Sequence, residues 1–546
     1  APHAMKPMYH DFASRRSMVV ARRGMVAASN PLASQAGLHI LRAGGSAADA
    51  AVAAAAVMNV TAPASTGVGG DCFALYYEAA TGKVTALNGS GRAPKALSLK
   101  RLKKAGITGE IPARSVHAVT VPGAARGWED LLSRFGRLEL ATVLEEAIHY
   151  ASQGFPVSPV FGAFWGDPAT AAFLRGKPNI EEYLPGGRGP APGETVRLPG
   201  LAGTLRAIAS GGADAFYTGP VAEAIVDTVR GEGGLLSKED LADHRSSWAE
   251  PIEIDYRGYR VLEHPPNGQG LAALLALQIA AGWELERMPW DSPERLHLMI
   301  EAMRLAFADA RRYVADPESA PAPLHALLSD AYAAERRGLV TPDRAMVPPS
   351  YGTPPDSSDT IYLCVVDGDG NACSFINSLY MGFGSGIVAK DYGIFLQNRG
   401  ANFSLEPGHP NQLHGGKRPY HTIIPGMLVK EGELVAPFGV MGGFMQPQGH
   451  LQVVNALVDD ALNPQEVLDR PRWMVDGGEP AGKILMEEGY PFKTLSRLAE
   501  LGHTVEPVSG RRRGVFGSGQ IILRESDTGV LYGGSDPRKD GLVAAY

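Results

Sequence analysis

The residue with the clearest chemical potential is Thr360, at the head of the first of two apolar runs, residues 360–366 and 372–378. The runs are joined by residues 367–371, Asp-Gly-Asp-Gly-Asn, whose types tolerate the positive φ of tight turns, so the pattern predicts a β-hairpin. Residues 354–359, just upstream, are rich in Pro, Asp and Ser. A cut in such a segment would not dismantle a core.

A cut directly before Thr360 would give this residue a free α-amine beside its own hydroxyl. A hydroxyl is a weak nucleophile until a base takes its proton, and an α-amine with a pKa of about 7.7 to 8.0 can be that base. The oxyanion formed by attack on an amide needs donors, which the backbone N–H groups of Gly442 and Gly443 could supply. Taken alone, a threonine at a strand start and a Gly-Gly pair are both ordinary. The hypothesis of a self-processed hydrolase therefore depends on the rest of the sequence.

Further motifs occur in order along the chain, and with Thr360 they resemble the γ-glutamyltransferase (γ-glutamyltranspeptidase) family. The resemblance covers nearly the whole sequence. The motifs are residues 24–33, residues 44–53, Gly67-Val68-Gly69-Gly70-Asp71-Cys72-Phe73, Val121-Pro122-Gly123, Tyr256-Arg257-Gly258-Tyr259, Pro265-Pro266-Asn267-Gly268-Gln269-Gly270, Met441-Gly442-Gly443 and Ser535-Asp536-Pro537-Arg538.

The resemblance implies an α/β fold, the four-layer αββα sandwich of N-terminal nucleophile hydrolases, built from two subunits of one precursor. The large subunit would be residues 1–359 and the small subunit residues 360–546. The family's oxyanion glycines fall on Gly442 and Gly443, and its hydroxyl that supports the nucleophile falls on Ser378, which keeps the hydroxyl and loses a methyl group. We expect no cofactor and no metal.

The positions that hold a γ-glutamyl donor in this family are almost all altered here. Losing charge-assisted contacts costs about 1.5 to 3 kcal/mol each, so a γ-glutamyl donor should bind poorly. Arg92 follows the first altered position by two residues and is displaced along an extended chain by roughly 6 to 7 Å. The family's Arg, Asn and Asp are replaced by Ser90, Tyr380 and Asn402, and its two serines by His421 and Thr422.

Arg399 is the cation that could take over substrate binding. It lies in Gln397-Asn398-Arg399-Gly400, and with His421 and Tyr380 it resembles the branch that includes oxamate amidohydrolase and cephalosporin-acylase-like proteins. This predicts a small, acidic acyl group held by Arg399, while a surface salt bridge is the alternative role. The connection from Asn402 to Lys417 is shorter than the lid of bacterial transpeptidases, and an uncovered pocket favours hydrolysis over transfer.

Three functions remain open. The first is an amidohydrolase or acylase that forms an acyl-enzyme on Thr360. The second is a true γ-glutamyltransferase or glutathione hydrolase that uses Arg92 and Arg399, which turnover of a γ-glutamyl anilide would identify. The third is an unprocessed binding or scaffold protein, which an uncut chain would favour. Nucleotide binding through residues 382–386, Gly-Phe-Gly-Ser-Gly, is disfavoured because the spacing is not that of a phosphate loop and no Lys follows.

Composition excludes several other classes of protein. The 546 residues are 45% hydrophobic and 20% charged with a net charge of −7, which indicates a globular chain that binds neither nucleic acid nor an anionic membrane. The most apolar window, residues 47–60, is too short to cross a bilayer and predicts a buried helix. The expected partners are a small amide substrate and water, the two subunits of one precursor, and a second copy in a possible homodimer.

Three cysteines, Cys72, Cys364 and Cys373, cannot all pair and lack zinc-type spacing, so buried thiols are expected. This favours a reducing, cytoplasmic location. Residues 1–8 lack a basic start followed by an apolar core, so a periplasmic or secreted location would require that a signal peptide has been removed.

Periodicity places these residues among helices and short strands. Strands on both sides of a helical centre indicate sheets covered by layers of helices. The predicted helices are residues 32–43, 46–58, 270–282, 292–314, 448–458, 464–468 and 492–501, with a capping box at Ser237; the predicted strands beyond the hairpin are residues 387–390, 394–397, 427–430 and 520–524.

Overall fold

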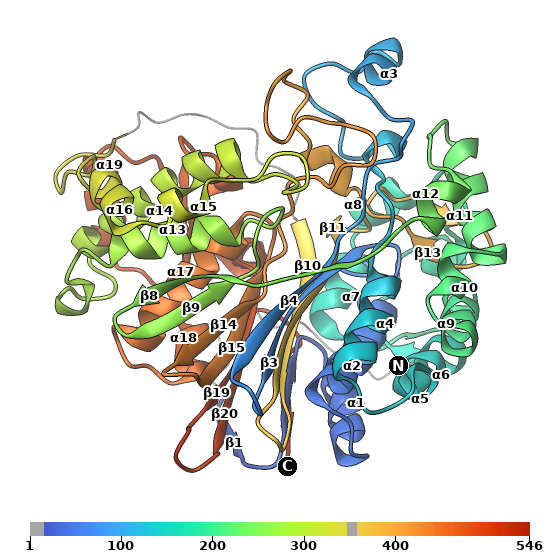
Figure 1. Ribbon diagram of the computed structural model, residues 1–546, viewed down its shortest axis with the longest axis horizontal. Helices are drawn as coiled ribbons and strands as arrows, with labels where there is room; N and C mark the ends of the chain where they lie inside the picture. Colours follow the sequence, from blue (N-terminus) through green and yellow to red (C-terminus); the bar gives the residue numbers. More distant parts are fainter. Residues whose placement is uncertain (1–15, 347–357) are drawn as a thin grey trace, which may run out of the picture.

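Two seven-stranded antiparallel sheets form the centre of the molecule (Figure 1). A computed structural model gives the structure of residues 16–346 and 358–546. The predicted cut region, residues 354–359, and the N-terminal residues 1–8 therefore lie partly or wholly outside the described residues. The α/β class with two large sheets, as expected from the sequence, is confirmed.

The sheet that holds Thr360 is built from distant parts of the chain. Its order is β21 (Leu542–Ala545), β2 (Met25–Ala28), β10 (Ser358–Val366), β11 (Ala372–Met381), β3 (Asp71–Glu78), β4 (Lys83–Gly89) and β7 (Ser247–Ala249). The facing sheet has the order β1 (Val19–Ala21), β20 (Leu531–Ser535), β19 (Ser518–Arg524), β15 (Glu433–Met441), β14 (Gly426–Lys430), β9 (Tyr259–Glu263) and β8 (Ile252–Tyr256). Each sheet thus combines strands from both sides of Thr360.

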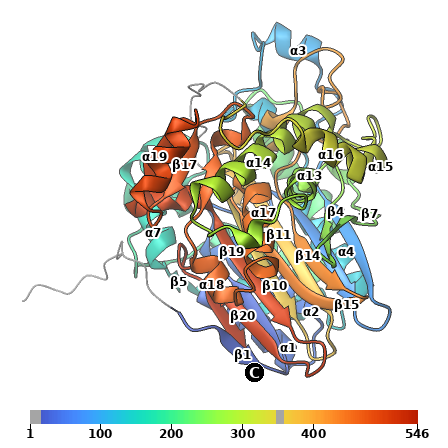
Figure 2. The same cartoon turned by 90° about the vertical axis from the view of Figure 1, so that its left-hand side faces the viewer.

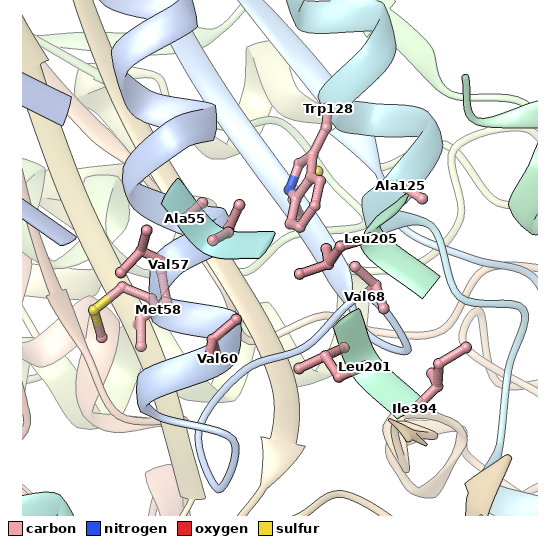
Figure 3. Packing of buried hydrophobic residues seen from close by; sticks show 14 of the residues in the cluster. Ala55, Val57, Met58, Val60, Val68, Ala125, Trp128, Leu201, Leu205 and Ile394 are labelled. Atoms are coloured by element: carbon pink, nitrogen blue, oxygen red, sulfur yellow. The ribbon is translucent and has the colours of Figure 1, made fainter. Parts of the chain in front are cut away.

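Helices cover the outer face of each sheet. Helices α1 (Pro31–Arg42), α2 (Ala47–Thr61), α4 (Ala124–Phe135), α6 (Glu145–Gln153) and α9 (Pro199–Gly211) share one buried cluster with the Thr360 sheet. Figure 3 shows Val57 and Val60 of α2 in this cluster with Trp128 of α4 and Leu205 of α9. Helix α2 is buried along its whole length, which explains its alanine-rich sequence.

The facing sheet is covered by α13 (Gly270–Ala280), α14 (Pro293–Tyr313) and α17 (Met445–Val458), and Figure 2 shows these helices over it. A third buried cluster fills the space between the sheets, with Phe73 and Tyr362 from one and Met427 and Ile522 from the other. Burial of apolar surface on both faces of both sheets supplies the main stabilising term of the fold.

The remaining α-helices and strands have at most 12 residues each. The helices are α3 (Leu99–Lys104), α5 (Leu140–Val143), α7 (Pro159–Trp165), α8 (Pro168–Leu174), α10 (Asp214–Tyr217), α11 (Pro220–Gly231), α12 (Lys238–Ala242), α15 (Leu324–Leu327), α16 (Asp330–Arg337), α18 (Pro464–Asp469) and α19 (Phe492–Glu500). The strands are β5 (Phe155–Pro156), β6 (Thr195–Val196), β12 (Val388–Ala389), β13 (Ile394–Phe395), β16 (Trp473–Val475), β17 (Ile484–Glu487) and β18 (Val505–Val508).

The helices and strands predicted from local sequence signals are present in the structure. The predicted helices appear within a few residues of their expected ends, and the capping box at Ser237 is present. A second box at Ser46 begins α2, where the Ser46 Oγ accepts from the Asp49 N–H at 3.3 Å and Asp49 accepts from the Ser46 N–H at 2.9 Å. Cys72, Cys364 and Cys373 are free and buried, as predicted. Within the described ranges, no helix has the length and apolar character to cross a membrane.

The predicted hairpin is confirmed and is longer than expected. Strand β10 begins at Ser358, two residues before Thr360, because the uncut backbone continues its ladder with β11. In the turn, the Asp367 carboxylate accepts from the N–H groups of Asp369 and Asn371, each at 3.0 Å, and Gly370 has φ +84°. Asp367 thereby fixes the turn with its own side chain.

Candidate active site

Thr360 lies at a β-bulge in the hairpin. The register shifts between Asp359 and Ile361, so that Ser378 and Leu379 of β11 both lie opposite Thr360. A bulge redirects side chains locally, and here it brings the Thr360 Oγ1 and Ser378 Oγ to 2.8 Å from each other. Both side chains are buried. The structure thus places Ser378 beside the nucleophile predicted from the sequence.

Ser378 is held by two further hydrogen bonds. Its Oγ accepts from the Tyr380 N–H at 2.8 Å and from the Arg399 Nη2 at 3.1 Å. In the contact between the Ser378 Oγ and the Thr360 Oγ1, either hydroxyl can be the donor. When Ser378 is the donor, its proton is placed to interact with negative charge on the Thr360 oxygen.

Arg399 is a buried cation beside this pair of hydroxyls. It begins a short 3-10 helix, Arg399–Asn402, and its N–H donates to the Gln397 Oε1 at 2.6 Å. Its Nη1 donates to the Thr422 Oγ1, and its guanidinium lies 4.4 Å from the centre of the Tyr380 ring. Burial lowers the pKa of Arg399 to about 10, opposed by the nearby charge of Asp71. The side chain is 1% exposed, so the alternative role in a surface salt bridge is wrong.

Asp71 is a functional candidate that the sequence reasoning missed. It begins β3, and its Oδ1 accepts from the N–H groups of Gly91 at 3.2 Å and Gly123 at 3.1 Å. Burial raises its pKa to about 7, while the Arg399 charge and these backbone donors oppose the rise. The available signal was a carboxylate placed directly between a glycine run and an apolar strand.

His421 is bound to Asp71 through a hydrogen bond of 2.8 Å from its Nε2 to the Asp71 Oδ2. Its Nδ1 accepts from the Ile423 N–H at 3.4 Å. Burial and the charge of Arg399 hold the pKa of His421 well below its usual range, so the ring is neutral. Both ring nitrogens therefore contact protein groups, and substrate contact by His421 stays a prediction.

The glycine run before Asp71 allows β3 to approach the bulge. A Cβ on Gly70 would lie 2.1 Å from the Ser378 carbonyl oxygen, and one on Gly69 would lie 1.8 Å from the Phe395 carbonyl oxygen. Any side chain at either position would force these backbones apart. The spacing of this motif is thus explained by close packing under the nucleophile.

Gly442 and Gly443 connect β15 to α17 in left-handed backbone conformations, with φ +129° and +56°. The Gly443 carbonyl accepts from the Gln269 Nε2 at 2.9 Å, and the same Nε2 donates to the Thr422 carbonyl at 2.7 Å. One amide side chain therefore ties the glycine pair to the residue that accepts from Arg399. Gln269 belongs to a motif quoted from the sequence, but its role was not anticipated.

The other predicted residues have three different surroundings. Ser90 is buried and donates to the Asn88 Oδ1 at 2.6 Å. The Arg92 guanidinium forms its ion pair, within the described part of the chain, with Glu318 at 3.3 Å, and so does not join the Thr360 group. Tyr380 and Asn402 line a cavity.

This cavity has a volume of about 920 Å³ and meets the Thr360 group at Tyr380, whose ring stacks on Arg399. Its walls combine aromatic rings with charged groups at Arg311, Glu479 and Lys483. The connection that follows Asn402, predicted to be too short for a lid, forms part of one wall. The wall residues from this connection are Phe403, Ser404, Glu406, His409 and Asn411.

One cluster has the residue types of a metal site. Potential ligand atoms of His297, Glu301 and His503 lie within 4.8 Å of one another. The His297 Nδ1 is 2.7 Å from the His503 Nε2, the His297 Nε2 is 2.7 Å from the Thr341 carbonyl, and the Arg304 Nη2 donates to the His503 Nδ1 at 3.2 Å. All four ring nitrogens thus have protein partners, and the cluster acts as a hydrogen-bonded chain between separate segments.

Comparisons with known proteins agree with this geometry. Residues 33–546 match the family model described as gamma-glutamyltranspeptidase. The chain is 38% identical over 533 residues to the glutathione hydrolase-like YwrD proenzyme of Bacillus subtilis, covering 96% of this chain and 99% of that protein. It is 35% identical over 537 residues to the oxamate amidohydrolase proenzyme of Klebsiella pneumoniae, with coverage of 96% and 99%. The crystal structure of cephalosporin acylase from Bacillus halodurans superposes with a TM-score of 0.92 at 47% identity, covering 100% of this chain and 99% of that one.

Fold and site together define an amidohydrolase of the N-terminal nucleophile class. The chain belongs to the gamma-glutamyltranspeptidase family, as its motifs had predicted, and its relatives include acylases and an oxamate amidohydrolase as well as glutathione hydrolases.

Proposed function

We propose that the chain is cut before Thr360 and that the new N-terminal threonine hydrolyses the amide of a small, acidic acyl group. The observation that carries this proposal is the buried arrangement of Thr360, Ser378 and Arg399, in which a cation lies one hydroxyl away from the nucleophile. The proposed subunits are residues 1–359 and 360–546.

In the proposed reaction, the Thr360 Oγ1 attacks the amide carbon while the Thr360 α-amine takes the hydroxyl proton. The N–H groups of Gly442 and Gly443 stabilise the oxyanion, and Ser378 donates to the attacking oxygen. The C–N bond then breaks, and the leaving amine takes the proton from the α-amine. Water, deprotonated by the α-amine, attacks the acyl ester and releases the acid and the Thr360 hydroxyl.

Several observations support an acidic acyl group. Arg399 is fixed by Gln397, Thr422 and Ser378 with its guanidinium facing the nucleophile. A relative of similar length acts on oxamate according to its name, and another is named a cephalosporin acylase. The cavity of about 920 Å³ leaves room for a leaving group beside Tyr380.

Processing is supported by the names of the relatives, which are proenzymes. Before the cut, the Thr360 nitrogen belongs to a peptide bond and cannot act as a base. Because β10 and β11 of the proposed small subunit pair with β2 and β3 of the large one, the two pieces would stay associated after the cut.

The alternative of γ-glutamyl transfer has less support. It needs Arg92 and Arg399 as a replacement for the altered clamp, and Arg92 pairs with Glu318 instead. Turnover of a γ-glutamyl anilide at a rate above that of oxamate would favour this alternative.

The deciding experiment measures the mass of the purified protein under denaturing conditions and sequences the N-terminus of each fragment. We expect two fragments, the smaller beginning Thr360-Ile361-Tyr362, and release of ammonia from oxamate. Thr360→Ala should give one uncut chain without activity. A cut and active Thr360→Ala protein would contradict the assignment of the nucleophile, and a single intact wild-type chain would contradict processing.

A further inference from the structure

Asp71 and Arg399 carry opposite charges in one buried site, yet the hydrogen bonds of the Asp71 carboxylate within the described residues go to groups other than the Arg399 guanidinium. The Asp71 carboxylate accepts from the N–H groups of Gly91 and Gly123 and from His421. Its remaining contact is a long hydrogen bond of 3.5 Å from the Gln397 Nε2. The carboxylate that balances the charge of Arg399 is therefore fixed by hydrogen bonds from Gly91, Gly123 and His421.

Two hydrogen-bond partners of Asp71, Gln397 and His421, connect it to Arg399. Gln397 binds Asp71 through its Nε2 and the Arg399 N–H through its Oε1. His421 binds Asp71 and precedes Thr422, whose Oγ1 accepts from Arg399. Asp71 thus orients the cation through two bridges, while the guanidinium donates towards Ser378 and Thr422.

Arg418 is the other charged residue near Asp71, and its own neighbours, including Asp316, balance its charge. Arg418 is a second buried cation, and its guanidinium donates to Ser90, Ser247 and Arg245. Its backbone N–H donates to the Asp316 carboxylate at 2.8 Å. The remaining titratable neighbours of Asp71 are His421, held neutral, and Cys72 and Tyr217, whose pKa values burial raises. Ionised Asp71 therefore leaves the surroundings of Thr360 without excess positive charge.

Hydrolysis changes the charge of the substrate. The reaction of a neutral amide group with water gives a carboxylate and an ammonium ion, so the acyl product carries one more negative charge than the acyl part of the substrate. A buried cation would hold such a dianion tightly. A nearby carboxylate that is not hydrogen-bonded to the guanidinium weakens this attraction through its charge alone.

We propose that Asp71 is a positioning residue that orients Arg399 and limits its affinity for dianions, so that an acidic amide binds and its dicarboxylate product is released. This inference rests on the function proposed above. We call the proposed effect of the Asp71 charge on the binding of mono- and dianions at this site the charge rule. The raised pKa of Asp71, about 7, is consistent with a carboxylate whose charge is costly at this position.

The test compares the processed wild-type protein with Asp71→Asn, using oxamate as substrate and oxalate as inhibitor. We expect the inhibition constant of oxalate to fall about tenfold and the KM of oxamate to fall as well, because the opposing charge is gone. The KM of a neutral amide of similar size should change less than about twofold. Equal changes for charged and neutral ligands, or no change in either, would overturn the proposal.

Two control variants separate charge from structure. His421→Gln alters the hydrogen bond to Asp71 without changing the charge, and the same fall in the oxalate constant in this variant would overturn the charge rule. Asp316→Asn removes the carboxylate beside Arg418 and should leave the ratio of oxalate to neutral-amide binding unchanged. A shift in that ratio equal to the one in Asp71→Asn would also count against Asp71.

Calorimetric binding of oxalate keeps the test independent of turnover. If the wild-type protein hydrolyses neither amide, the proposed function fails, but tighter oxalate binding to Asp71→Asn would still support the charge rule. If Asp71→Asn does not fold, the same calorimetric comparison at one pH is made with Asp71→Ser, which also removes the negative charge. Tighter oxalate binding to Asp71→Ser than to the wild-type protein agrees with the proposal, and equal or weaker binding contradicts it.

Discussion

In the proposed mechanism, Arg399 combines two roles that a single substitution can separate. It donates to Ser378, the proposed support of the nucleophile, and beside Tyr380 it is the buried cation proposed to bind the acyl group. Arg399→Ala should lower kcat for every amide, and it should also raise KM for acidic amides by about tenfold or more, since a charge-assisted hydrogen bond is worth about 1.5 to 3 kcal/mol. Steady-state kinetics with an acidic and a neutral amide measure both effects.

The matched variant Arg399→Lys keeps the charge and loses the planar fork, so it should retain part of the preference for acidic amides. A KM that rises equally for acidic and neutral amides in Arg399→Ala would show that this residue does not read substrate charge.

At this scale, the sequence singled out residues that a motif marks and passed over those whose partners are distant. Thr360, Ser378 and Arg399 were predicted from the hairpin pattern and the family motifs, and the structure brings them together, while their roles stay a prediction. Asp71 and Gln269 were missed in spite of lying in quoted motifs, because their roles depend on contacts with residues 153 to 350 positions away. Local patterns contain no information on such pairs.

Among the elements, the turn before β19 supports the glycine pair through a buried ionic network. Asp536 accepts from the Gly519 N–H at 2.8 Å and pairs with Arg472 at 2.8 Å, while Arg472 donates to the Phe516 carbonyl at 3.1 Å. A Cβ on Gly442 would lie 3.2 Å from the Cα of Gly517 in this turn. The network explains part of the motif Ser535-Asp536-Pro537-Arg538.

Asp536→Asn should lower the free energy of unfolding by about 3 to 5 kcal/mol, because it leaves the buried Arg472 without its ion-pair partner. Equilibrium unfolding in urea measures this loss. The control is Asp527→Asn, which alters an exposed carboxylate in the turn between β19 and β20 and should change stability by less than about 0.5 kcal/mol. Similar values for the two variants would show that the buried network contributes little.

The sequence predicted single elements better than their pairing. Helix caps and the hairpin turn are local, and both were located correctly. The pairing of β2 with β21 joins residues 25–28 to residues 542–545, and no local pattern encodes it. The bulge at Thr360 was likewise not anticipated, because it depends on register rather than on residue type.

Over the whole molecule, the chain of His297, His503 and Arg304 connects α14 to the segments around Thr341 and beyond α19. Burial and the charge of Arg304 lower the pKa of His503 to about 3, against about 6.5 in an unfolded chain. The unfolded state therefore binds the extra proton between these values. The contribution of neutral His503 to stability is complete above pH 6.5 and is lost as the pH falls below it.

We therefore expect the difference in unfolding free energy between the wild-type protein and His503→Asn to be largest at pH 7 to 8. It should narrow by about 1.4 kcal/mol per pH unit as the pH falls from about 6 towards 4. Urea unfolding at several pH values measures it, with His39→Asn as the exposed control that should show no narrowing. A constant difference for His503→Asn would contradict a buried, neutral ring.

Strand β10 runs unbroken through the proposed cut, with Ser358 paired to Met381 and Asp359 paired to Tyr380. Met381 and Tyr380 also line the cavity beside the nucleophile. The backbone on the upstream side of the proposed cut therefore pairs with two residues that line the cavity. If residues 358 and 359 moved away after the cut, the backbone of Tyr380 and Met381 would become accessible. A substrate with an extended amide could then pair with the same backbone.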